Sequence, residues 1–191
     1  IDEADQVYST GQSEEVNQLR NAIHGVQTIC LSATKNDTIH TYFDTPFEEV
    51  SQGEIAVNDK ITSYYLETEN KKDTLLSLLH SLPITSAIIF VNHRSTAIEL
   101  SDLLLRNNIL SSAFSGYFDE RKRIAIMSDF RKGDIRVLVA TDAAARGIDI
   151  HELSHVIHYD IPIDTETFIH RSGRTAHQGD EGISISLLTS E

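Results

Sequence analysis

The chain has 191 residues, 40% of them hydrophobic and 24% charged, and this ordinary globular composition excludes a disordered or collagen-like protein. Sixteen Lys and Arg residues against 29 Asp and Glu residues give a formal net charge of −13. That balance argues against a protein that coats nucleic acid non-specifically, because such binding needs cations, but it leaves room for a small, localised RNA site. Cys30 is the single cysteine. It excludes an internal disulfide and favours a reducing cytoplasm.

Short apolar runs alternate with amphipathic stretches along the chain, which is typical of a parallel sheet covered by helices. The expected strands are residues 26–31, 86–91, 136–140, 155–159 and 183–188. The expected helices, each with its apolar residues on one face, are residues 73–82, 97–105 and 120–130. The sequence therefore predicts an α/β fold with three layers.

The polar stretch 51–60 contains Gly53 and interrupts this pattern, which indicates a linker. Residues 1–50 hold too few elements to bury a core of their own. We therefore expect them to be the end of one domain, whereas residues 61–191 suffice for a complete second α/β domain.

Two short motifs lie near the N-terminus. In I-D-E-A-D, Asp2 and Glu3 stand where nucleotide hydrolases hold Mg²⁺ and orient water, although such a string is also typical of a solvated turn. Ser32-Ala33-Thr34 follows the run 26–31, where α/β folds place ligands, although this tripeptide is also a common strand exit.

Two longer motifs lie nearer the C-terminus. Residues 139–150, V-A-T-D-A-A-A-R-G-I-D-I, run from a strand into a turn of small residues. There Thr141 can donate to a phosphate, and Asp149 can accept from a ribose hydroxyl. In H-R-S-G-R-T, residues 170–175, the spacing predicts Arg171 and Arg174 on one helical face. Paired guanidiniums suit a γ-phosphate, and a solvated helix face is the alternative.

In sequence, order and spacing, these motifs together with I-I-F-V-N-H-R resemble the second half of a DEAD-box RNA helicase across essentially the whole chain. The resemblance implies two RecA-like domains that close on ATP and single-stranded RNA, with residues 61–191 as the second. It also implies that the chain begins inside the Walker B motif, without a phosphate-binding loop. We therefore expect this chain alone to be inactive.

The resemblance further assigns roles to individual residues. Asp2 would hold Mg²⁺ through water, Glu3 would position the hydrolytic water, and Arg174 would touch the γ-phosphate. The nucleotide and the domain interface would be served by Asp149, Arg171 and Gly147. The RNA contacts would be Arg94, Thr141, Gly116 and Arg123, with Phe90 and Asn92 in a segment near the RNA path. Hydrolysis would be coupled to domain closure by Asp5, Ser32, Thr34 and His170.

The sequence departs from the family pattern at three positions. The family motif ends in T-G-R, but Ala176 and His177 follow Thr175 here, so the second phosphate-touching arginine is missing. Glu120 also stands where the family usually has Gln.

The sequence favours an ATP-dependent RNA helicase that separates strands locally. His177 favours the alternative of a low-turnover RNA-binding or scaffold protein with the same fold. A DNA helicase of a related branch is a further alternative. The nine histidines show no H-E-x-x-H or Cys-paired spacing that would indicate zinc.

Overall fold

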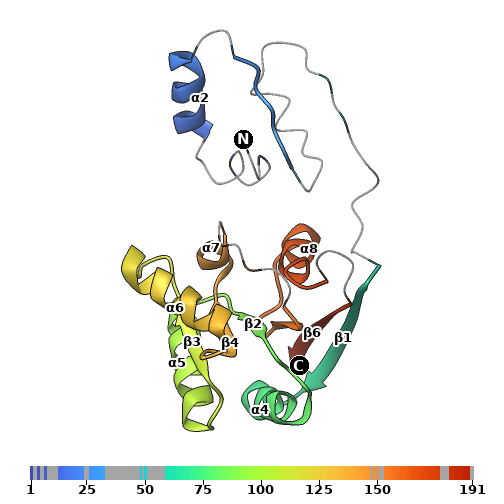
Figure 1. The fold of residues 1–191 in the computed structure, drawn as a ribbon. Helices are drawn as coiled ribbons and strands as arrows, with labels where there is room; N and C mark the ends of the chain where they lie inside the picture. The colour runs from blue at the N-terminus through green and yellow to red at the C-terminus, as the bar shows by residue number, and fades with distance from the viewer. Residues whose placement is uncertain are drawn as a thin grey trace. The chain divides into compact units, whose positions relative to one another are not determined.

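A computed structural model describes residues 1, 4, 7, 13–23, 26–32, 48, 50, 59–146, 148, 150, 153–176 and 181–189. The chain divides into two compact units, Ile1–Ala56 and Val57–Glu191 (Figure 1). The division falls within the predicted linker, of which only residues 59 and 60 are described. The roles assigned to the two parts of the chain stay predictions.

The N-terminal unit contains the helix α2, Ser13–Ala22, which the sequence analysis missed. The predicted strand at residues 26–31 is wrong, since this segment carries no regular strand. It pairs with the start of the chain: Leu31 N donates to Ile1 O at 2.8 Å, and Ala4 N donates to Leu31 O at 2.9 Å. Its apolar side chains are exposed, because the described part of this unit offers no sheet to bury them.

The C-terminal unit is built on six parallel strands in the order β1-β6-β5-β2-β4-β3 (Figure 1). In that order the strands are β1 Ile61–Thr68, β6 Gly182–Thr189, β5 His155–His158, β2 Ala87–Phe90, β4 Val137–Ala140 and β3 Ser111–Phe114. The four strands predicted after residue 80 are confirmed within a residue or two. The two that the sequence missed, β1 and β3, lie at the edges of the sheet, where a strand does not need an apolar run.

Five helices accompany the sheet: α4 Lys71–Ser81, α5 Arg94–Arg106, α6 Glu120–Lys132, α7 Asp142–Ala145 and α8 Thr165–Ser172. The first three confirm the predicted helices. Their starts differ from the prediction by up to three residues, and in α4, which begins two residues before the predicted start, the side chain of Asn70 caps the helix. Among the described residues, no helix is long and apolar enough to cross a membrane.

Alternate residues of the central strands point into two separate apolar layers, as the pleat of a strand requires. Ile89 packs in the layer that α4 and α5 cover. Ile88 and Phe90 pack in the layer that α6 and α7 cover. The helix α8 lies on this second face, where Phe168 stacks on His158 of β5 with 4.7 Å between ring centroids. The predicted three-layer α/β fold is confirmed.

The first and last strands of this unit are neighbours. β1 pairs in parallel with β6 along its whole length, from Ile61 opposite Gly182 to Thr68 opposite Thr189. Gly182 begins β6 where the segment after α8 passes close by. A Cβ atom there would lie 2.6 Å from Thr175 Cγ2 and 2.7 Å from Ala176 N.

Replacing Gly182 with alanine should therefore overpack this crossing. We expect Gly182→Ala to lower the free energy of unfolding by about 1–3 kcal/mol in urea titrations of the chain. Gly116→Ala is the matched control, because a Cβ at Gly116 meets no atom within 4 Å. Equal losses in the two variants would contradict the close approach at Gly182.

Candidate functional site

Several of the described site residues that the sequence predicts in the C-terminal unit lie at the carboxyl edge of the sheet. The strands β5, β2, β4 and β3 are neighbours, and their carboxyl ends point the same way. They are followed by Asp160, Asn92, Thr141 and Gly116, respectively. Residues far apart in the sequence thus form one row along this edge.

Asp160 joins the ends of β5 and β2. Its Oδ2 accepts from Asn92 N at 2.8 Å, and its own N–H donates to Phe90 O at 3.1 Å. Its carbonyl accepts from Arg171 Nη1 at 2.7 Å. Asp160 therefore holds the turn that leads from β2 into α5 through two hydrogen bonds, and Arg171 holds Asp160 through a third. The sequence analysis missed Asp160, because its partners are distant along the chain.

Arg171 forms a bidentate ion pair with Asp142, at the start of α7. Its Nε lies 2.6 Å from Oδ1, and its Nη2 lies 2.7 Å from Oδ2. The Arg171 side chain is only 2% exposed, and its guanidinium covers the ring of Phe90 at 5.0 Å. Arg171 thus ties α8 to α7, while its predicted role toward the nucleotide stays a prediction. Phe90 is a core residue and offers no surface to RNA.

Arg171 and Arg174 do not share a helical face, so that prediction is wrong. The helix α8 ends at Ser172, and Arg174 lies in the turn beyond it. Arg174 is half-buried and donates through Nη1 to Ile148 O at 3.2 Å. Among the described residues this is the one hydrogen bond of the Arg174 side chain, so the other donors of its guanidinium fit a phosphate oxygen.

Arg94 and Tyr117 meet above the row of strand ends. Arg94 is the exposed first residue of α5, and its guanidinium lies 4.8 Å from the centroid of the Tyr117 ring. Tyr117 follows Gly116 in the turn after β3 and is 83% exposed. The sequence analysis missed Tyr117; its one signal was an aromatic residue beside glycine at a strand end. An exposed ring beside a guanidinium can stack on a nucleic-acid base.

Backbone N–H groups add to this surface. His93 and Thr141 are the residues just before α5 and α7, and neither side chain caps its helix. The first N–H groups of α5 thus lack a side-chain cap, and such groups bind phosphate readily. Arg123 of α6 lies over the buried Phe114 ring at 5.5 Å. The structure thus places the predicted RNA residues on neighbouring strand ends and helix starts.

The remaining predicted residues are placed less fully. His170 lies in the last turn of α8, with its Nε2 4.0 Å from Glu166 Oε1, and Ser32 belongs to the N-terminal unit. The others lie outside the described residues: Asp2, Glu3, Asp5, Thr34, Gly147, Asp149 and His177. The part of the chain that is described contains no group of three His, Cys, Asp or Glu side chains that could hold a metal ion.

His158 lies buried beneath α8, next to the Arg171 pair. Its Nε2 lies 3.0 Å from Ser184 Oγ of β6 and 3.3 Å from Ser172 Oγ of α8. Burial lowers the pKa of His158 from 6.5 to about 3, helped by the positive charge of Arg171 and opposed by Asp142. His158 is therefore neutral in the folded protein.

Comparison with known proteins places this geometry in a family. Residues 70–179 match the model of the helicase conserved C-terminal domain. The ATP-dependent RNA helicase FAL1 of Lodderomyces elongisporus is 36% identical over 197 residues, covering 99% of this chain and 49% of the relative. The chain spans about half the length of the curated relatives that it matches.

Two solved structures carry the same likeness. Dbp5 of S. cerevisiae, bound to RNA and ADP BeF3, has a TM-score of 0.87 and 31% identity over 100% of this chain and 52% of that one. The E. coli DEAD-box protein SrmB, bound to the regulator of ribonuclease activity A, has a TM-score of 0.63 and 38% identity over 66% and 76% of the two chains. The chain belongs to the helicase C-terminal domain family, and within it to the DEAD-box proteins.

Ala176 adopts a backbone conformation that favours glycine. Its φ is 58°, and it occupies the position where the family motif has Gly. A left-handed conformation costs a non-glycine residue roughly 1–2 kcal/mol. Glycine avoids this cost, but it loses more backbone entropy on folding, so the net gain is smaller. We expect Ala176→Gly to raise the free energy of unfolding by about 0.5–1 kcal/mol in urea titrations.

Ala125→Gly is the matched control for this substitution. Ala125 is an exposed residue inside α6, where glycine should lower the free energy of unfolding by about 1 kcal/mol. A loss of stability in both variants would contradict a left-handed Ala176.

The neutral His158 should make stability depend on pH. Between pH 6.5 and pH 3 the unfolded chain binds a proton at this position that the folded chain does not. The free energy of unfolding should therefore fall with pH, by about 1.4 kcal/mol per pH unit below 6.5. In urea titrations from pH 7 to pH 5, His158→Asn should show a flatter dependence than the natural chain, whatever its stability at pH 7. Parallel curves would show that His158 does not titrate as described.

Proposed function

We propose that this protein is an ATP-dependent RNA helicase, which couples ATP binding and hydrolysis to RNA binding and local separation of strands. The observation that carries the proposal is the surface formed by Arg94, Tyr117 and the starts of α5 and α7. It combines a cation, an exposed ring and backbone N–H groups on neighbouring strand ends. The family to which the chain belongs supports the same function.

RNA would lie along this edge through its sugar-phosphate backbone. Phosphates would be bound by Arg94 and by the N–H groups at the start of α5, and Thr141 would approach the next phosphate. The Tyr117 ring would stack on a base, which any base permits. We therefore expect binding without base preference. With a net charge of −13, the chain should also neutralise few phosphates.

ATP would be bound beside the turn that follows α8. The unused donors of Arg174 fit a phosphate, and the Arg171–Asp142 pair holds α8 just before that turn. ATP with Mg²⁺ supplies the phosphoryl group whose transfer to water drives the cycle. From the family resemblance, Asp2 would hold the metal through water, and Glu3 would orient the attacking water.

A second function has an observation in its favour. His177 stands where the family has an arginine, and it follows the strained Ala176. A protein that lost one phosphate-touching arginine would bind RNA and turn over little ATP. ATPase assays of the full-length protein, with single-stranded RNA or DNA as stimulator, distinguish the alternatives. Stimulation by RNA supports the helicase, stimulation by DNA alone supports a DNA helicase, and no stimulation supports the scaffold.

The RNA surface can be tested on the chain itself. We expect Arg94→Ala to weaken binding of a fluorescent single-stranded RNA at low salt, and to lower the slope of log K against log salt by about one phosphate contact. Fluorescence anisotropy measures both quantities. Arg106→Ala is the matched control, because Arg106 lies in the last turn of the same helix. Equal effects of the two substitutions would contradict the proposed surface.

A further inference from the structure

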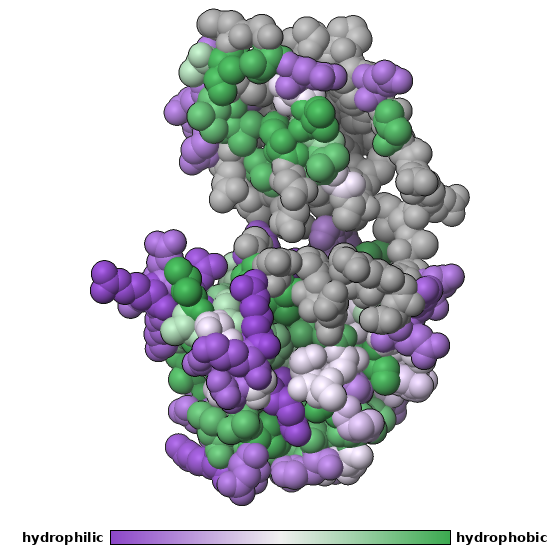
Figure 2. Space-filling view, in the orientation of Figure 1, coloured by the Kyte–Doolittle hydropathy of each residue, from purple (hydrophilic) through white to green (hydrophobic). Residues whose placement is uncertain are grey.

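The helix α6 concentrates positive charge in an acidic protein. Five of the 16 Lys and Arg residues of the chain lie within its 13 residues, against two acidic residues. The cations stand at its two ends, namely Arg121, Lys122, Arg123, Arg131 and Lys132. Figure 2 shows hydrophilic side chains gathered over this helix, with hydrophobic atoms among them.

An open pocket of about 660 Å³ runs along one side of α6. Its lining residues on the helix recur every three or four positions, from 120 to 132, so they form one stripe. The apolar part of the lining includes Ile124, Met127 and Ile148, of which Met127 and Ile148 are buried and Ile124 is 61% exposed. The stripe therefore offers aliphatic surface to solvent in the middle of a charged helix.

The cations of the lining stand on either side of this apolar surface. Arg123 lies toward the start of the helix, and Arg131 and Lys132 lie at its end. Arg131 lies eight positions after Arg123 in the sequence, which is about 12 Å along a helix. The surface thus combines an aliphatic centre with positive charge about two helical turns apart.

Protein fits this surface better than nucleic acid does. The one aromatic residue in the lining is Phe114, which is 2% exposed and covered by the Arg123 guanidinium. No ring of the described lining is therefore open to stack on a base, and phosphates would leave the apolar surface of Ile124 uncovered. Aliphatic side chains flanked by carboxylates would satisfy both features.

We propose that this groove of α6 binds an acidic, amphipathic segment of a protein partner. Leucine-like side chains would cover the exposed Ile124, and carboxylates would pair with Arg123 at one end and with Arg131 and Lys132 at the other. The negative charge of the rest of the chain would steer such a segment to this helix. Arg123 is also a predicted RNA contact, so on the proposed function the partner would compete with RNA for it.

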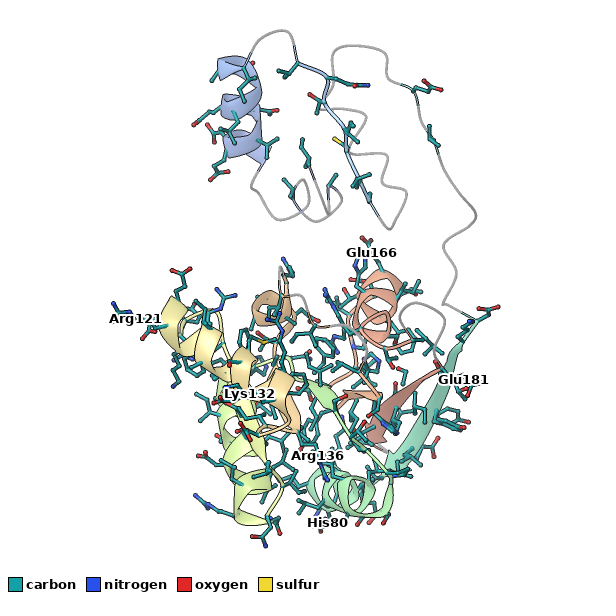
Figure 3. All side chains as sticks on the ribbon, viewed as in Figure 1. His80, Arg121, Lys132, Arg136, Glu166 and Glu181 are labelled. Atoms are coloured by element: carbon teal, nitrogen blue, oxygen red, sulfur yellow. The ribbon has the colours of Figure 1, made fainter. Side chains whose placement is uncertain are left out.

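Charge reversal at two places on α6 tests the groove. Lys132 lines the pocket, whereas Arg121 does not, and the two lie at opposite ends of the helix (Figure 3). The probe is a fluorescent helical peptide of about four turns with leucines on one face and glutamates beside them. We expect Lys132→Glu to weaken its binding about tenfold or more in anisotropy titrations, and Arg121→Glu to weaken it less than about threefold.

A second variant tests the apolar centre. Ile124→Ser should weaken peptide binding about fivefold or more without loss of stability, because Ile124 is exposed. A peptide with lysines in place of the glutamates should bind far more weakly than the probe. Equal effects of Lys132→Glu and Arg121→Glu, or tight binding of the lysine peptide, would overturn the proposal, as would the absence of binding by the natural chain.

Titration with single-stranded RNA separates this proposal from the proposed function. If Lys132→Glu weakened RNA binding but left peptide binding unchanged, the groove would be an RNA surface and the proposal would be overturned. If the chain bound the peptide as expected but bound no RNA, the groove would stand and the proposed RNA function would fail. Displacement of bound RNA by excess peptide would support the competition at Arg123.

Discussion

The buried ion pair between Arg171 and Asp142 is the contact on which the carboxyl edge of the sheet depends. One guanidinium binds both oxygens of Asp142, the carbonyl of Asp160 and the face of Phe90. It thereby joins α8, α7 and the ends of β5 and β2. Removing Asp142 would leave the Arg171 charge buried without its carboxylate partner, which costs about 3–5 kcal/mol in buried pairs. Thr141 precedes Asp142, Arg174 follows the end of α8, and Asn92 bonds to Asp160, so all three lie next to this contact.

A second set of polar contacts holds the other side of α8. Ser172 and Ser184 lie 3.1 Å apart, and both approach Nε2 of His158. The ring of Phe168 stacks on His158, so α8 is attached to the sheet by polar and aromatic contacts together. Buried polar networks of this kind fix one arrangement, because any shift leaves donors and acceptors without partners. Such contacts fix the position of the turn that follows α8 and carries Arg174.

The central strands could be predicted from the sequence because they are buried on both faces and therefore read as apolar runs. The edge strands β1 and β3 could not be predicted in this way, because an edge strand does not need a continuous apolar run. The strand β1 contains Tyr64 and Tyr65, and β3 contains Ser111 and Ser112. The extended segment at 26–31 has the same composition as a buried strand, and only its surroundings distinguish it.

The candidate site residues that lie inside a sequence motif could be predicted, and those outside a motif could not. Thr141 and Arg94 were found because they belong to recurring strings of residues. Asp160 and Tyr117 act through partners far away in the sequence, which no local pattern shows. The exit of α8 at Ser172 decides where Arg174 lies, and the spacing of two arginines does not contain that information.

The pairing of β1 with β6 also has a consequence for folding during synthesis. The first strand of the C-terminal unit hydrogen-bonds, within the sheet, only to the last strand. The chain leaves the ribosome with its N-terminus first, so β1 is synthesised early. It cannot pair with β6 until nearly the whole unit has been synthesised. Contacts between such distant segments form slowly. Until β6 arrives, both edges of β1 are unpaired, and the Tyr64-Tyr65-Leu66 stretch is open to aggregation or to a chaperone.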